Sequence, residues 1–159
     1  MTLYVRRANG RYSVADINQI TRAAAELLKS SLHGEPALSS PDRASTFLQT
    51  RLRPLEHELF CMLVLDNRHR LIEFVELFRG TIDGATVYPR VVAEIALRHG
   101  AAAVIAAHNH PSGIAEPSLA DQAITRRLKD ALALLDIRLL DHFVVGDGAP
   151  VSMAARGMV

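Results

Sequence analysis

Cysteine is nearly absent from this sequence, since Cys61 is the only one among 159 residues, which include seven histidines. A single cysteine cannot form an internal disulfide, which indicates a reducing compartment, and it cannot build a closed zinc site from thiolates. The sequence also lacks a run of 18 apolar residues, and its first residues contain no apolar stretch typical of a signal peptide. We therefore expect a soluble, cytoplasmic protein without a membrane segment.

The sequence has no excess of charge of either sign. Lys and Arg total 18 and Asp and Glu total 17, so the net charge is +1 and offers nucleic acid no broad attraction. The length of 159 residues excludes a (β/α)₈ barrel, which needs about 250, and fits one domain. With 49% hydrophobic and 22% charged residues, the composition is that of a globular protein with a real core.

The N-terminal region is expected to be an arm followed by a helix. Arg6, Arg7 and Arg11 lie in the first twelve residues, which contain no acid, and we interpret them as a solvated terminus. Ser13 and Asp16 have the spacing of a capping box, and apolar residues then recur at helical intervals. These patterns predict a helix over about 13–32, within an N-terminal part that we place at residues 1–36.

The main domain is expected over residues 37–159, where helical and strand patterns alternate. Pro41 suits the first position of a helix, and apolar runs at 59–66 and 71–78 predict two strands joined by a tight turn. The other predicted elements are a helix from Tyr88-Pro89 to Gly100, a buried strand at 101–107, a polar loop at 108–117, a helix over about 118–135, a strand over about 138–145 and a short strand at 151–153. This order predicts an α/β sandwich, with a mixed central sheet flanked by helices.

The residues best suited to chemistry are concentrated between His108 and Asp121. His108 and His110 are two residues apart at the end of the buried strand, so on extended chain both imidazoles project to the same side. Asp121 lies in the first turn of the next helix, and Pro and Gly in the intervening loop allow the chain to fold back. Two nitrogens and one oxygen leave a fourth position for water, which is the pattern of catalytic rather than structural zinc sites.

Each part of this pattern also has an ordinary structural explanation. A pair of histidines two residues apart is common without a metal, and Ser118 and Asp121 form a capping box that needs none. A carboxylate held by a helix terminus can still give an oxygen to zinc, so the two interpretations are compatible. Asp141 and His142 interrupt a later apolar strand, and we favour a hydrogen-bonded structural pair over a second metal site.

The spacing His108-x-His110-Pro111, six residues, Ser118, two residues, Asp121 resembles the JAMM zinc motif of JAB/MPN-domain metalloproteases. The segments LFRGTIDGATVYPR, AHNHPSG, EPSLADQAITRRL and LLDHFVVGDG are similar to signature segments of the RadC family, over about residues 37–159. The chain resembles the short, single-domain members, without the helix-hairpin-helix region of longer ones. The resemblance implies an MPN or cytidine-deaminase-like sandwich.

The resemblance also implies roles for individual residues. His108, His110 and Asp121 would hold Zn²⁺, and Ser118 would help to stabilise the oxyanion. An upstream Glu would be the general acid and base, and its position points to Glu58. The alternatives are Glu56, two residues earlier, and Glu73 and Glu76 on the next strand.

The function implied in this way is that of a zinc-dependent hydrolase, a metallopeptidase or isopeptidase that cleaves an amide bond in a peptide or protein substrate. One alternative is a non-catalytic MPN-type interaction module, whose signature would be a missing ligand. The other is a DNA-repair-associated accessory protein, which the family's name suggests, and the residues that would test it are Arg6, Arg7 and Arg11. Salt-sensitive DNA binding that weakens when these arginines are replaced would support it.

Overall fold

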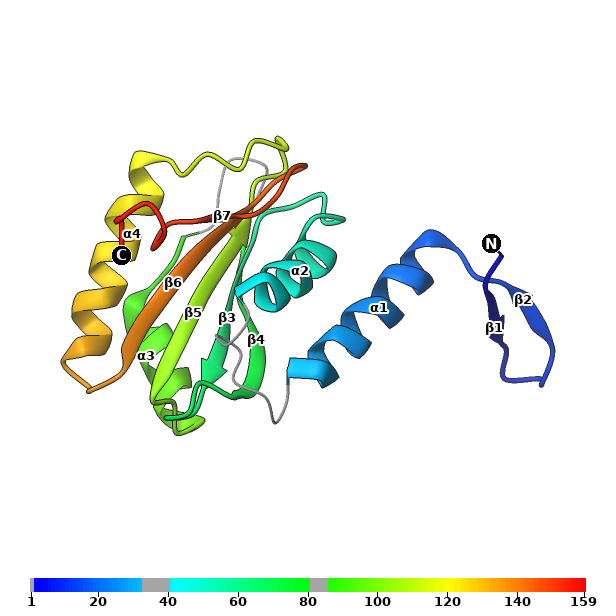
Figure 1. Ribbon diagram of the computed structural model, residues 1–159, viewed down its shortest axis with the longest axis horizontal. Helices are drawn as coiled ribbons and strands as arrows, with labels where there is room; N and C mark the ends of the chain where they lie inside the picture. The colour runs from blue at the N-terminus through cyan, green and yellow to red at the C-terminus, as the bar shows by residue number, and fades with distance from the viewer. Residues whose placement is uncertain (1, 33–40, 81–85) are drawn as a thin grey trace.

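The structure, a computed structural model, describes residues 2–32, 41–80 and 86–159 (Figure 1). Its elements in chain order are β1 (Tyr4–Arg6), β2 (Tyr12–Val14), α1 (Ile17–Leu32), α2 (Pro41–Leu52), β3 (Leu59–Leu65), β4 (Leu71–Arg79), α3 (Pro89–Arg98), β5 (Ala103–Asn109), α4 (Leu119–Ala133), β6 (Arg138–Val145) and β7 (Val151–Ser152). Within these residues, no helix is long and apolar enough to cross a membrane.

Within the described ranges, the central sheet has five strands in the order β4-β3-β5-β6-β7. β3 pairs antiparallel with both β4 and β5, whereas β5 and β6 are parallel, because α4 carries the chain back to the starting edge of the sheet. β7 is antiparallel to β6. The sheet is therefore mixed, and its parallel strands β5 and β6 are joined by a β5–α4–β6 crossover.

Helices cover both faces of the sheet, because β3 and β5 are apolar at successive positions and so must be buried on both sides (Figure 1). On one face, Phe47, Leu48 and Leu52 of α2 pack against alternate residues of β3, β5 and β6. On the other face, α3 and α4 pack against the remaining positions. The predicted α/β sandwich with a mixed central sheet is confirmed.

The N-terminal region differs from the prediction. Residues 4–6 and 12–14 pair as an antiparallel hairpin, so residues 12–14 are strand and not the first turn of a helix. Ser13 accepts a hydrogen bond from Arg7 Nε (2.7 Å), and α1 begins after Asp16. The capping pair is Asp16 with Gln19, in which each side chain binds the other residue's backbone N–H. The expected Ser13–Asp16 cap is therefore wrong.

Helix α1 contacts the body of the protein through its second half. Ala25 is buried, Leu28 packs against the α2-side core, and Lys29 Nζ lies 2.6 Å from Glu73 Oε1 of β4. The hairpin lies at the other end of α1, away from the sheet (Figure 1). The expected boundary between residues 36 and 37 lies outside the described residues.

Strand β5 ends two residues later than predicted, so His108 and Asn109 belong to the sheet and not to the loop. Both are almost completely buried, at 1% and 2% exposed. Polar side chains are tolerated in such a strand only when their hydrogen bonds are satisfied, and both have partners inside the protein.

Candidate metal centre

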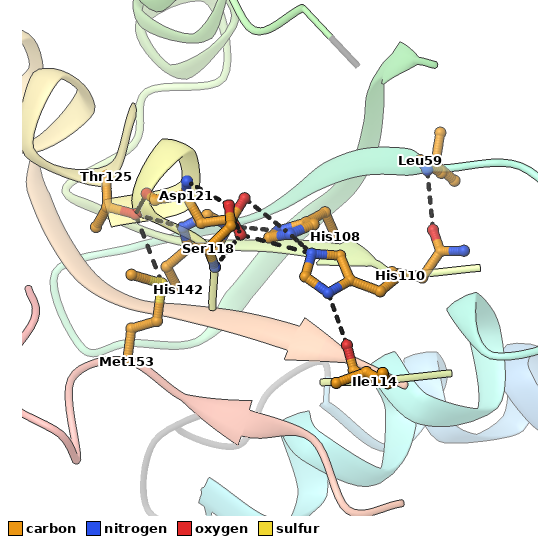
Figure 2. Close-up of polar contacts among 10 residues, drawn as sticks. Leu59, His108, His110, Ile114, Ser118, Asp121, Thr125, His142 and Met153 are labelled. Carbon is orange, nitrogen blue, oxygen red and sulfur yellow. Dashed lines mark hydrogen bonds and ion pairs between the residues drawn. The ribbon is translucent and has the colours of Figure 1, made fainter. Parts of the chain in front are cut away.

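The ends of β5 and α4 bring the two histidines of the motif together. His108 is the sixth residue of β5 and faces α4, whereas His110 follows the strand with its side chain turned the same way (Figure 2). Their Nε2 atoms are 2.9 Å apart. The two-residue spacing on extended chain accounts for this convergence.

Asp121 reaches the same point from the first turn of α4. Its Oδ1 lies 3.1 Å from His108 Nε2, and its Oδ2 lies 3.5 Å from His110 Nε2. Ser118, the N-cap of α4, fixes this carboxylate: the Ser118 N–H and hydroxyl both donate to Oδ2, at 2.7 and 2.6 Å. The Ser118 hydroxyl oxygen in turn accepts from the Asp121 N–H (3.1 Å). The capping box therefore aims the carboxylate at the two imidazoles.

The electrostatics of the site favour an ionised carboxylate. Burial alone would raise the pKa of Asp121, but the adjacent imidazoles of His108 and His110 and the hydrogen bond from Ser118 hold that pKa well below its ordinary value. The pKa of His110 is raised, mainly by its hydrogen bond to Asp121 and in smaller part by its bond to the Ile114 carbonyl and by the charge of Glu58. The site is thus built to hold positive charge next to Asp121.

The loop after β5 determines which nitrogen of His110 faces the site. His110 Nδ1 lies 2.7 Å from the carbonyl oxygen of Ile114 (Figure 2). A carbonyl only accepts, so Nδ1 carries a hydrogen. In the protonated ring Nε2 donates to Asp121, whereas in the neutral ring Nε2 keeps a lone pair on the side of the site. This is the form in which histidine binds a metal.

A second pair of buried side chains lies behind His108, and neither residue was expected at the site from the sequence. His142 of β6 and Thr125 of α4 are each 0% exposed. His142 Nε2 lies 2.9 Å from His108 Nδ1, and His142 Nδ1 lies 2.6 Å from Thr125 Oγ1 (Figure 2). Burial lowers the pKa of His142 well below its usual value, so the ring is neutral at neutral pH.

Asp141 and His142 do not pair through their side chains, because neighbouring residues on a strand face opposite sides. The carboxylate of Asp141 accepts hydrogen bonds from its neighbour's backbone N–H, from Ser152 Oγ and from the Ala154 N–H. Asp141 is therefore structural, as expected, and no second metal group includes it in the described part of the chain. His142, however, belongs to the surroundings of the first site.

A cleft of about 600 Å³ opens in front of these residues. Its lining includes all three members of the histidine and aspartate group, together with Ser118, Arg127 and Glu58. Glu58 precedes β3, which is paired with β5, so the two segments meet at the same end of the sheet. Asn109 strengthens this contact: its Oδ1 accepts from the Leu59 N–H (2.9 Å) and its Nδ2 donates to the His57 carbonyl (3.0 Å).

The other candidate carboxylates lie elsewhere. Glu73 is paired with Lys29 of α1, and Glu76 is paired with Arg51 of α2 in a separate cavity between the helices. Glu56 is exposed and is not part of the cleft wall. Among the four residues considered, Glu58 alone lines the cleft.

The donor set fits a transition metal ion of the zinc type. His108, His110 and Asp121 each offer one ligand atom, and these atoms all lie within 4.8 Å of one another. Two imidazole nitrogens and one carboxylate oxygen are ligands that zinc accepts, and the side open to the cleft leaves room for a fourth. In the neutral His110 ring, the nitrogen that faces the group is an acceptor, which suits a cation between the side chains.

Comparison with known proteins agrees with this geometry. A family model described as a RadC-like JAB domain matches residues 38–158. The chain belongs to the RadC-like JAB domain family. A UPF0758 protein of Halorhodospira halophila is 54% identical over 158 residues, which are 99% of this chain and 70% of the relative. For a UPF0758 protein of Thioalkalivibrio sulfidiphilus, the identity is 56% over 96% of this chain and 68% of the relative.

Other relatives in this family are matched over a smaller share of their length. A UPF0758 protein of Aeromonas hydrophila is 60% identical over 124 residues, which are 78% of this chain and 55% of the relative. These names state no activity. Membership of the RadC-like JAB domain family and the His-His-Asp group are both compatible with a metal-dependent hydrolase.

Proposed function

We propose that this RadC-like domain is a zinc-dependent hydrolase that cleaves an amide bond in a peptide or protein. The observation that carries the proposal is the convergence of His108 Nε2, His110 Nε2 and the Asp121 carboxylate on one point of a cleft that Glu58 also lines. When bound there, zinc would supply a Lewis acid and an activated water. The JAB/MPN domain family, which includes metalloproteases, supports the same conclusion.

Glu58 is the proton carrier in this proposal. A general base must lie within reach of the proton it accepts, and Glu58 shares a wall of the cleft with the metal group. Its carboxylate would take the proton of the attacking water and pass it to the leaving nitrogen. The charge of Glu58 also contributes to the raised pKa of His110, which supports this assignment.

Ser118 has two tasks in this proposal, and they compete. Its hydroxyl donates to Asp121 Oδ2, so it can serve an oxyanion only by giving up that hydrogen bond. The Ser118 N–H donates to the same oxygen and would keep Asp121 in place while the hydroxyl turns to the substrate. Donors aimed at a developing oxyanion stabilise the transition state.

The cleft is large enough for a stretch of peptide, because pockets for ligands of drug size measure about 300–1,000 Å³. Its walls combine apolar side chains, Phe60 and Ile124, with the cation of Arg127 and the carboxylate of Glu58. A segment with an extended backbone and mixed side chains is the substrate that such a surface would accept.

The decisive experiment combines metal analysis with a peptide-library cleavage assay. We expect about one zinc per chain in protein purified without chelator, and none in His108→Ala. Glu58→Gln should keep its zinc and lose cleavage by about 10²–10⁴-fold, the usual contribution of a general base. Glu56→Gln, a change of the same kind two residues away and outside the cleft, should keep both zinc and cleavage.

Three results would contradict the proposal. Wild-type protein without stoichiometric zinc would contradict the proposed metal site. Unchanged cleavage in Glu58→Gln would contradict the assignment of Glu58 as the proton carrier. Zinc-loaded protein that cleaves no member of the library would favour a non-catalytic module instead.

A further inference from the structure

Three groups form a continuous chain of hydrogen bonds behind His108. They are the His142 ring on β6, the Thr125 hydroxyl on α4 and the backbone carbonyl of Asp121, one turn earlier in the same helix (Figure 2). The distances are 2.9 Å from His108 Nδ1 to His142 Nε2, 2.6 Å from His142 Nδ1 to Thr125 Oγ1, and 2.5 Å from Thr125 Oγ1 to the Asp121 carbonyl oxygen. Met153 Sδ contacts the same hydroxyl at a longer distance, 3.6 Å.

The carbonyl at the end of this chain determines the direction of every bond in it. A carbonyl oxygen has no hydrogen to give, so the single hydroxyl hydrogen of Thr125 lies between Oγ1 and the Asp121 carbonyl. Thr125 Oγ1 can then only accept from His142, so His142 Nδ1 carries a hydrogen. The neutral His142 ring presents a lone pair at Nε2, and this lone pair accepts the hydrogen on His108 Nδ1.

We infer that Thr125 and His142 are positioning residues that fix the tautomer of His108, with its hydrogen on Nδ1 and the lone pair of Nε2 aimed at the metal position. The inference rests on the proposed function only in naming a metal as the partner of that lone pair. Two backbone carbonyls thus determine which ring nitrogen carries the hydrogen in each imidazole. The Ile114 carbonyl acts on His110 directly, and the Asp121 carbonyl acts on His108 through Thr125 and His142. Asp121 therefore serves the site with its carboxylate and with its carbonyl.

The role predicted for Thr125 is chemical as well as structural. Without its hydroxyl, His142 Nδ1 loses its acceptor, and the ring is free to carry its hydrogen on Nε2 instead. His142 would then donate to His108 Nδ1, which would move the His108 hydrogen onto Nε2, the nitrogen that should bind the metal. Groups that orient a metal-ligating histidine typically contribute about 10–100-fold to metal affinity.

The test compares Thr125→Val, which has nearly the same shape without the hydroxyl, with Thr125→Ser, which keeps it. Zinc dissociation constants would be measured by competition with a chromophoric chelator, and the ring tautomers by two-bond ¹H–¹⁵N correlation spectra of zinc-free protein. We expect Thr125→Val to weaken zinc binding about 10-fold or more and to move the hydrogen of His108 toward Nε2. Thr125→Ser should resemble wild type in both measurements.

A matched control separates this effect from the loss of a helix hydrogen bond. Thr50 of α2 donates to the carbonyl four residues earlier, at 2.8 Å, as Thr125 does. Thr50→Val removes that bond away from the site and should leave zinc affinity unchanged. His142→Phe, which removes the middle of the chain, should weaken zinc binding at least as much as Thr125→Val.

Thr125→Val with wild-type zinc affinity and an unchanged His108 tautomer would overturn the inference, and so would an equal loss of affinity in Thr125→Ser. The tautomer measurement uses zinc-free protein, so it remains decisive even if wild type proves to bind no zinc. In that case the proposed function fails by itself, and a hydrogen on Nδ1 of His108 in wild type but not in Thr125→Val still supports the chain.

Discussion

Asn109 joins β5, the strand that carries His108, to the segment that carries Glu58. The residue is 2% exposed, and its amide binds the Leu59 N–H and the His57 carbonyl on either side of Glu58. No other side chain of this length carries both a hydrogen-bond donor group and a separate acceptor group without a charge. The position of the proposed proton carrier therefore depends on a residue of the neighbouring strand.

Asn109→Ala should lower the free energy of unfolding by about 2–6 kcal/mol, because it leaves one buried donor and one buried acceptor unsatisfied, at about 1–3 kcal/mol each. Urea denaturation monitored by circular dichroism would measure the change. Asn67→Ala, at an exposed turn position, is the control and should change stability by less than about 0.5 kcal/mol. Equal effects of the two substitutions would contradict the role of Asn109.

At the scale of residues, the sequence predicted the contacts between residues that lie close together along the chain. His108, His110, Ser118 and Asp121 lie within fourteen positions, and their types and spacing were enough to bring them together. His142 was expected only as part of a structural pair, because its contact with His108 spans 34 positions. That contact depends on the parallel register of β5 and β6, which contains an irregularity that spacing alone cannot predict.

At the scale of elements, the loop that follows β5 and the loop that follows β6 pack against each other at the edge of the site. The N–H of Asp147 donates to the Gly113 carbonyl at 2.8 Å, and the His110 N–H donates to the Val145 carbonyl at 2.8 Å. A Cβ built on Gly146 would lie 2.3 Å from the Gly113 oxygen and 2.8 Å from the Ala115 nitrogen. Both are backbone atoms, so the loop that positions Ile114 could not avoid the clash without moving.

Gly146→Ala should therefore destabilise the protein by about 1–3 kcal/mol, the usual cost of overpacking. It should also weaken zinc binding, because the displaced loop carries the Ile114 carbonyl that orients His110. Gly148→Ala is the matched control, since a Cβ there meets nothing within 4 Å. Thermal unfolding and zinc titration of both variants would measure the two effects, and similar behaviour of the two variants would refute the prediction.

The capping box of α4 allows a second prediction at this scale. Ser118→Ala should cost about 1 kcal/mol of unfolding free energy in zinc-free protein, because an N-cap hydroxyl is lost. Ser118→Thr keeps a capping hydroxyl and should cost less. Urea denaturation would compare the three proteins, and a Ser118→Ala variant as stable as wild type would show that the Asp121 carboxylate caps the helix without the hydroxyl.

Most of the helices and strands were predictable, because they carry a clear apolar pattern and recognisable end signals. The helix from Pro89 and the strand over 138–145 were predicted close to their observed bounds. The β1–β2 hairpin was not, since each strand has only three residues and too little pattern to recognise. The end of β5 was placed too early because polarity suggested a loop, whereas Asn109 and His108 satisfy their polar groups inside the sheet.

At the scale of the whole molecule, the proposed metal should stabilise the folded state by mass action. A ligand at 100 times its dissociation constant contributes about 2.7 kcal/mol, which for a chain of this size corresponds to a rise in melting temperature of about 5–10 °C. Differential scanning fluorimetry with zinc should show this rise in wild type. His110→Ala should show little or none, because the site loses one of three ligands.

Magnesium serves as the metal control for this experiment. It prefers octahedral oxygen ligands, so an excess of Mg²⁺ should leave the melting temperature nearly unchanged. An equal rise with both metals, or the same rise in His110→Ala, would mean that the stabilisation arises away from the proposed site.

The architecture of the sandwich was predictable from the order of elements, since helices before and after a buried strand pair leave few arrangements. The position of Glu58 at the cleft was not predictable in this way, because it depends on β3 lying between β4 and β5. Only the family resemblance singled out Glu58 among four carboxylates. The structure then places two of the others, Glu73 and Glu76, in ion pairs with α1 and α2.

The β5–α4–β6 crossover has a consequence for how this site can change. The metal group and the hydrogen-bond chain behind it lie within one continuous stretch, residues 103–145, whereas Glu58 comes from a different segment. Under the proposed function, ion binding and proton transfer are therefore separable properties. Loss of Glu58 would leave a folded, metal-loaded protein without a hydrolytic step, so that one substitution would convert an enzyme into a binding module.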